Sequence, residues 1–204
     1  MTDFNWNGDA LLSSAVGAFI GSVLTLLGVW MSSHLEKFER EAQNKEELIG
    51  FLQGIHDEIE TLWDSYTSSI GAQTEALLDN SPLMFFWPIT QEYFTIYNTN
   101  AHAIGKIKNH DLRRQIVATY AKARGLIDSY RMNNDLIQKY EYIALLFQET
   151  NSPSHQANAA ARYQSLIQYA AQLRPRHNDL KTMVGDLLRN LRKEGVLAPN
   201  GSKS

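Results

Sequence analysis

An uncharged apolar segment near the N-terminus is the strongest pattern in this chain. It runs from Ala10 to Ser33 as ALLSSAVGAFIGSVLTLLGVWMSS, and its most polar residues are serine and threonine. A hydrocarbon core of about 30 Å needs roughly 20 helical residues, which this segment exceeds. A core helix of a soluble domain usually keeps a polar stripe, and none is found here. The pattern predicts a retained transmembrane helix over residues 10–33, with a buried core helix as the alternative.

The flanks of this segment set the expected orientation. A cleaved signal is disfavoured because such signals open with a basic region, whereas this N-terminus has Asp3 and Asp9 and no Lys or Arg. The C-terminal flank has Lys37, Arg40 and Lys45, and the positive-inside rule, under which nearby acids count for little, puts it in the cytoplasm. We expect a single-pass membrane protein, with residues 1–9 as a short outer tail. Three aromatic residues are the expected interfacial anchors: Phe4, Trp6 and Trp30.

A row of small residues runs along the predicted span. Ala10, Gly17, Gly21 and Gly28 are separated by seven, four and seven positions, which places them on one side of a helix. Gly17 and Gly21 form a GxxxG, and small residues let helices in a bilayer pack closely. The row predicts self-association into a homo-oligomer in the lipid bilayer. The alternative is that small residues are simply common in spans.

The polar remainder of the chain predicts an all-α fold. A repeat of mostly apolar positions at intervals of three or four residues runs from Leu35 to Leu77, with three polar interruptions and without a Gly-Pro linker after the span. We therefore expect the transmembrane helix to continue into a long stalk helix over residues 34–79. An antiparallel helical bundle over 80–195 would pack on this stalk in the cytoplasm, and residues 196–204 would form a flexible tail.

Three helices are expected within the bundle region. A short one would start at Pro88 and carry the apolar positions up to Ile104. A long one would run from about Asp111 to Gln148, after a turn at GKIKNHD. The last would begin after Ser152 and Pro153, end near Glu194, and be kinked or split at Pro175.

An apolar cluster interrupts the pattern in the stretch DNSPLMFFWPIT. Its residues are Met84, Phe85, Phe86 and Trp87, between two prolines that mark a loop. One interpretation is an exposed docking loop. The other, which is the more common fate of such clusters, is a plug that packs into the local core.

Charge is distributed unevenly along the cytoplasmic part. Residues 36–79 hold eleven acids and three bases, whereas the region after them is mildly basic. The simplest interpretation is that basic helices pack beside an acidic stalk. An alternative is an anion-binding face made of Lys106, Lys108, Arg113, Arg114, Lys122 and Arg124. We do not expect direct nucleic-acid binding, because no nucleic-acid-binding motif accompanies these bases.

The sequence shows no catalytic or cofactor-binding motif, so we expect neither an enzyme nor a bound cofactor. The chain has no cysteine, which excludes disulfides and Cys-based metal sites. His56 and Glu60 lie one helical turn apart, but a metal site in a helical bundle needs ligands from several helices. A solvated acidic face explains this pair better. Arg131, Asn133 and Asn134 fall mid-helix, where buried polar contacts that fix helix register would explain them.

One run of the sequence resembles a pattern in uncharacterised bacterial membrane proteins. It is YFTIYNTNAHAIGKIKNHDLRRQIVATYAKARGLIDSYRMNN, from Tyr93 to Asn134, about a fifth of the chain. Proteins of this kind have an N-terminal span and a helical cytoplasmic domain, and they resemble those carried on prophages and other mobile elements. Some are effectors of anti-phage systems, including retrons. Retron effectors with two spans differ from this chain, which has one, and the shared motifs are structural, so they assign no functional residue.

Two functions follow as expectations. The first is a membrane-acting effector of bacterial antiviral defence that self-associates through the small residues of its span. The second is a non-toxic membrane scaffold whose bundle docks a cytoplasmic protein or nucleoprotein partner, with Met84 to Trp87 as the docking loop.

Overall fold

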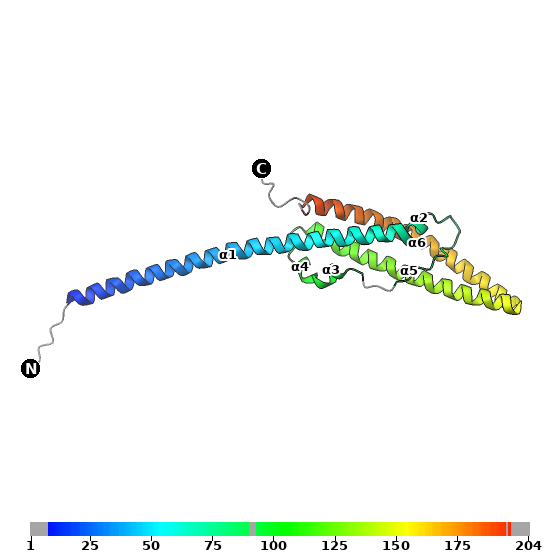
Figure 1. Cartoon of the computed structure of the whole chain (residues 1–204), viewed down its shortest axis with the longest axis horizontal. Helices are drawn as coiled ribbons and strands as arrows, with labels where there is room; N and C mark the ends of the chain where they lie inside the picture. The colour runs from blue at the N-terminus through cyan, green and yellow to red at the C-terminus, as the bar shows by residue number, and fades with distance from the viewer. Residues whose placement is uncertain (1–7, 90–92, 195, 197–204) are drawn as a thin grey trace, which may run out of the picture. The chain divides into compact units, whose positions relative to one another are not determined.

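The computed structural model describes the backbone of residues 8–89, 93–194 and 196, with side chains from residue 25 onward. All regular elements within these ranges are helices, as the sequence predicts (Figure 1). They are α1 (Gly8–Tyr66), the π-helical turn η1 (Thr67–Gly71), α2 (Ala72–Glu75), α3 (Thr95–Thr99), α4 (Ala101–Ile104), α5 (His110–Thr150) and α6 (Pro153–Lys193). The chain divides into two units, residues 1–47 and residues 48–204.

The first unit is the N-terminal part of α1. Its described side chains, from Thr25 to Glu47, are all exposed. Trp30, His34 and Phe38 follow one another at intervals of four residues, and their rings contact each other in turn, with centroids 4.9 and 5.9 Å apart. Farther along, Arg40 pairs with Glu36 at 3.1 Å. No helix among the described residues has a stretch both long and apolar enough to cross a membrane.

The second unit is a helical bundle with one hydrophobic core. Helices α5 and α6 form its antiparallel hairpin and lie side by side in Figure 1. Asn109 caps the start of α5 by accepting hydrogen bonds from the backbone N–H groups of Asp111 and Leu112. Asn151, in the left-handed conformation, ends α5, and its N–H bonds the Phe147 carbonyl. These caps fix the boundaries of the hairpin close to the predicted ones.

The core of the bundle joins α5 and α6 to the C-terminal part of α1. Ile55 and Ile59 of α1, Ile116 of α5, and Leu173 and Leu187 of α6 are at most 3% exposed. Burying such aliphatic side chains contributes roughly 1.5–3 kcal/mol each. The predicted apolar seam is thus buried only in part: its members around Ile55 enter the core, whereas Leu35 and Phe38 are 57% and 67% exposed.

Two predicted helices differ from the observed ones. The helix expected to continue to Leu78 is interrupted after Tyr66 by η1, in which Ser69 has non-helical angles (φ −121°, ψ −109°). Serine and threonine hydroxyls bond carbonyls one turn back here, from Thr67 to Trp63 and from Ser69 to Ser65, which is a known cause of helix bending.

The short helix expected from Pro88 is also wrong. Pro88 lies in irregular structure, and the next helix in the described part of the chain begins at Thr95, after Phe94 adopts a positive φ of 70°. Glu58 explains the position of α3, because its carboxylate accepts hydrogen bonds from the N–H groups of Ile96 and Tyr97 at 2.6 and 3.2 Å. At the other end of the bundle, α6 continues through Pro175 as one helix and is not split.

Candidate functional site

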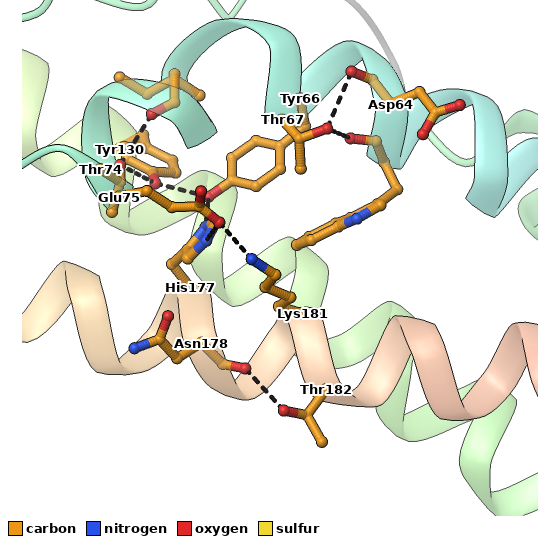
Figure 2. Close-up of polar contacts among 12 residues, drawn as sticks. Asp64, Tyr66, Thr67, Thr74, Glu75, Tyr130, His177, Asn178, Lys181 and Thr182 are labelled. Carbon is orange, nitrogen blue, oxygen red and sulfur yellow. Dashed lines mark hydrogen bonds and ion pairs between the residues drawn. The ribbon is translucent and has the colours of Figure 1, made fainter.

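A chain of polar side chains crosses the core of the bundle (Figure 2). Tyr66, at the end of α1, is its centre: the phenol oxygen lies 2.8 Å from the Tyr130 hydroxyl and 2.6 Å from His177 Nδ1. Tyr130 in turn contacts the Thr74 hydroxyl at 2.7 Å. On the other side, His177 Nε2 lies 3.1 Å from a carboxylate oxygen of Glu75. Residues from α1, α2, α5 and α6 therefore meet in one network.

The network runs from the core to the solvent. Thr74 and His177 are fully buried, and Tyr130 is 1% exposed. Glu75 and Lys181 close the outer end, where the ammonium nitrogen and a carboxylate oxygen lie 2.7 Å apart with both side chains about half exposed. Buried polar groups cost free energy unless they are hydrogen-bonded, so each member depends on its neighbours.

The hydroxyls of the network form a continuous series of hydrogen bonds. Thr74 donates to the Ile70 carbonyl at 2.9 Å, so its oxygen is free to accept the bond from Tyr130. The two ring nitrogens of His177 face different partners, Nδ1 the Tyr66 hydroxyl and Nε2 the Glu75 carboxylate. Tyr66, Tyr130, Thr74 and His177 are thereby linked from the core to Glu75.

Electrostatics follow from these contacts. The hydrogen bond from Lys181 lowers the pKa of the Glu75 carboxyl below its ordinary value, and His177 lowers it further. Burial raises the pKa of the Tyr66 and Tyr130 phenols, so both remain protonated at neutral pH. The tyrosines are thus neutral hydroxyls that donate and accept, and the ion pair of Glu75 with Lys181 lies at the outer end of the network.

A cavity of about 280 Å³ adjoins the network. Its walls include the rings of Trp63, Tyr66, Trp87 and Tyr130, and aliphatic side chains of α1, α5 and α6 complete the lining. Ser65 and Ser69, at the kink of η1, are the polar side chains of the lining besides the tyrosines. Concave, mostly apolar sites with a few polar groups are typical of ligand-binding pockets, and π-helical turns often occur at functional sites.

The predicted docking loop is split by the structure. Met84, Phe85 and Phe86 are 46%, 38% and 48% exposed, whereas Trp87 packs against the core. Asn134 fixes the Trp87 backbone, accepting from its N–H and donating to its carbonyl at 3.1 and 2.6 Å. Trp87 is therefore packed as the plug interpretation expects, and the preceding three residues form an exposed apolar surface.

The six bases predicted as an anion-binding face lie on α5 and in the turn before it. Lys122 pairs with Asp179 of α6 at 2.8 Å, and Arg114 lies 3.7 Å from Asp111. Arg113 donates to the Ile107 carbonyl, while Arg124 contacts the Asn98 side chain. Lys106 and Lys108 are exposed in the turn before α5. Four of the six bases thus have partners within the bundle, and these partners lie outside the acidic segment 36–79.

Other predicted residues are placed as follows. His56 is 1% exposed and contacts Asp57 and Arg192, rather than lying on a solvated face. No group of three or more candidate ligands for a metal occurs among the described residues. Asn133 is buried and donates to the Leu83 carbonyl, whereas Arg131 is exposed and pairs with Asp128. Phe4 and Trp6 lie outside the described residues, as do the side chains of Ala10, Gly17 and Gly21.

Sequence reasoning missed the polar network and the cavity. Tyr66, Thr74, Tyr130 and His177 lie far apart along the chain and match no short motif. The one signal in the sequence was that a histidine and several tyrosines occupy positions of the helical repeat where apolar core residues are expected. No family model matches this chain, nor does any curated protein or solved structure.

Proposed function

We propose that this chain is a single-span protein of the bacterial inner membrane, with its N-terminus outside and its bundle in the cytoplasm. The observation that carries the proposal is the uncharged run from Ala10 to Ser33, which belongs to α1. In the described part of this run, Leu26, Val29 and Trp30 are each more than 60% exposed. Apolar helix surface of this kind is stable when lipid tails cover it.

Cysteine labelling tests this topology, because the chain has no cysteine of its own. A Thr2→Cys variant should react with a membrane-impermeant maleimide in intact spheroplasts. A Ser154→Cys variant, at the exposed start of α6, should react only after the membrane is permeabilised. Recovery of the chain in the soluble fraction, or labelling of Ser154→Cys in intact spheroplasts, would contradict the proposal.

The role that we assign to this membrane protein is an effector of antiviral defence that acts on the bilayer as an oligomer. The row Ala10, Gly17, Gly21 and Gly28 supports self-association. A Cβ atom added at Gly28 would meet nothing within 4 Å, so no contact within the described chain requires glycine there. A neighbouring helix packed against the row would require it.

Membrane depolarisation tests the effector role. Expression of the wild-type chain should depolarise bacteria, as reported by a potential-sensitive dye, and Gly17→Leu/Gly21→Leu should abolish the effect. The matched control is Ala15→Leu/Ser22→Leu, which adds leucines roughly 130° away from the row on the same helix. All three proteins are compared at equal membrane levels. No depolarisation by the wild type, or equal loss in both variants, would contradict an effector that acts through this row.

A second candidate function is a membrane scaffold that docks a cytoplasmic protein partner. The exposure of Met84, Phe85 and Phe86 favours it, because exposed apolar clusters mark contact surfaces. A photo-crosslinking residue at position 85 should capture one defined protein in cells. Phe86→Ser should weaken that crosslink, whereas Leu145→Ser, at an exposed apolar position of α5, should not. A crosslink insensitive to Phe86→Ser would remove this candidate.

A further inference from the structure

We propose that the cavity of the bundle binds an amphipathic small molecule with an apolar body and an anionic head, such as a medium-chain fatty acid. The proposal concerns residues 48–204 alone. It goes beyond the membrane role above and stands whether or not the N-terminal segment spans a bilayer.

The cavity suits the apolar body of such a ligand. Its lining holds aliphatic side chains such as Ile59, Leu126 and Val184 beside the aromatic walls, and no acidic or basic side chain. Its volume of about 280 Å³ lies near the lower end of the usual range for small-ligand pockets, roughly 300–1,000 Å³. Transfer of a hydrocarbon chain into this space is favourable because apolar surface leaves water.

A polar cleft of about 560 Å³ adjoins the apolar cavity. Tyr93, Phe94 and Ile127 line both hollows, so the two abut across these side chains. Two guanidinium groups, Arg124 and Arg131, line the cleft, together with a single carboxylate. The cleft therefore carries a net positive charge beside an uncharged cavity.

Arg124 is available to an anion. Its partners in the structure are the Asn98 side-chain oxygen and the rings of Phe94 and Tyr97, at 5.9 and 5.7 Å. None of these partners carries a full negative charge, so the guanidinium keeps its positive charge uncompensated by them. Arg131 does pair with Asp128 at 3.0 Å, but both side chains are more than half exposed. Exposed ion pairs of this kind contribute little to stability, so Arg131 can exchange Asp128 for another anion.

The geometry gives the ligand an orientation. Its hydrocarbon chain would enter between Trp63 and Trp87, and its carboxylate would reach the guanidinium of Arg124. A carboxylate matches the planar donor fork of arginine, which makes this head group a better fit than a cationic or neutral one.

Quenching of tryptophan fluorescence tests the proposal. The full chain is reconstituted in phosphatidylcholine nanodiscs with Trp6→Phe and Trp30→Phe, which leaves Trp63 and Trp87 as the only emitters. ω-Bromoundecanoic acid carries a bromine atom that quenches tryptophan on contact. We expect saturable quenching, with about ten-fold weaker binding of ω-bromoundecanol, which lacks the charge.

Variants separate the two halves of the site. Arg124→Gln should weaken binding of the acid about ten-fold, whereas Lys122→Gln, which removes a charge from α5 outside the cleft, should leave it unchanged. Ala123→Phe should abolish saturable quenching, because Ala123 lines the cavity and the added ring fills it. Circular dichroism shows whether each variant is folded. If Ala123→Phe is not folded, Ala123→Leu replaces it as the cavity-filling variant.

Two results would overturn the proposal. Quenching that is non-saturable, or equal in the wild type and a folded cavity-filling variant, would mean that the acid only partitions into the lipid. Equal binding of the acid and the alcohol, with no effect of Arg124→Gln, would exclude the anionic head and leave a neutral ligand.

Discussion

At the scale of single residues, His177 joins the buried and exposed halves of the polar network. Its ring is fully buried, stacks 5.9 Å from Trp63, and bonds Tyr66 on one side and Glu75 on the other. The hydroxyls of Tyr66, Tyr130 and Thr74 follow it in series, and each is hydrogen-bonded to the next. Removing one hydroxyl should therefore affect the stability of the whole bundle rather than one contact.

Tyr130→Phe tests this dependence. The change removes the hydroxyl that bonds both Thr74 and Tyr66, and we expect the free energy of unfolding to fall by about 1–3 kcal/mol. Urea denaturation followed by circular dichroism measures it. Tyr142→Phe is the control, because Tyr142 is 64% exposed and its change should cost nothing measurable. Equal stabilities of the two variants would mean that the network contributes no net stability.

The carboxyl of Glu75 should titrate below the ordinary glutamate pKa of about 4.3. Because Lys181 is the main cause of the lowered pKa, Lys181→Gln should move it back toward the ordinary value. Carbon-13 NMR of labelled glutamate measures both titrations, with Lys122→Gln as the control that leaves Glu75 unchanged. A carboxyl with a lowered folded-state pKa stabilises the fold above its unfolded pKa. That contribution is lost as pH falls through the folded value.

At the scale of elements, η1 is what brings the network together. A continuous α-helix would set Thr74 and Glu75 on a different side of the chain from the one they occupy. The π-helical turn shifts the helical register after Tyr66, and Ile70 and Thr74, within and beyond the turn, are both buried. The turn also brings Gly71 close to Tyr66: a Cβ at Gly71 would lie 2.9 Å from the Tyr66 carbonyl oxygen.

Two glycine substitutions test this close approach. Gly71→Ala should destabilise the bundle by about 1–3 kcal/mol, because the added methyl group forces the backbone apart at Tyr66. Gly125→Ala, in the middle of α5, should instead stabilise it by about 0.5–1 kcal/mol, since nothing lies within 4 Å of its Cβ position. Thermal unfolding measures both. A neutral or stabilising Gly71→Ala would argue against η1 as described.

The ends of α5 could be predicted from the sequence, whereas the position of η1 could not. The ends of α5 follow from local signals: the Asn109 cap and the turn at Asn151 act within a few residues. The kink at Ser69 combines local hydroxyl–carbonyl bonds with a distant contact, that of Tyr66 with Tyr130. The positive φ of Phe94 accompanies the packing of its ring on Tyr120, which is also distant in sequence. The network and cavity were invisible for the same reason, because their residues become neighbours only through tertiary packing.

At the scale of the whole molecule, the chain consists of two units with different side-chain environments. The described side chains of residues 25–47 are exposed, whereas the core begins with Phe51 and Leu52. The core of the second unit draws on α1, α5 and α6, and among the described residues none before Leu48 belongs to it. The second unit thus has the core that an independent domain needs.

A fragment that starts at Leu48 should therefore fold without the N-terminal segment. We expect it to be monomeric in water, highly helical by circular dichroism, and to melt in one cooperative transition. The full chain in nanodiscs provides the reference for its helical signal. Aggregation or a broad, non-cooperative melt would show that the bundle needs residues before Leu48.

The contact between Gln53 and Val196 has a consequence for how the protein is made. The Gln53 amide donates to the Val196 carbonyl at 2.7 Å, and the Val196 side chain is 1% exposed against the core. On the ribosome, α1 is synthesised before α6, so the domain closes only after Val196 has been added to the chain. The apolar segment emerges long before that moment, and any targeting machinery would meet it while the rest of the chain is still unfolded.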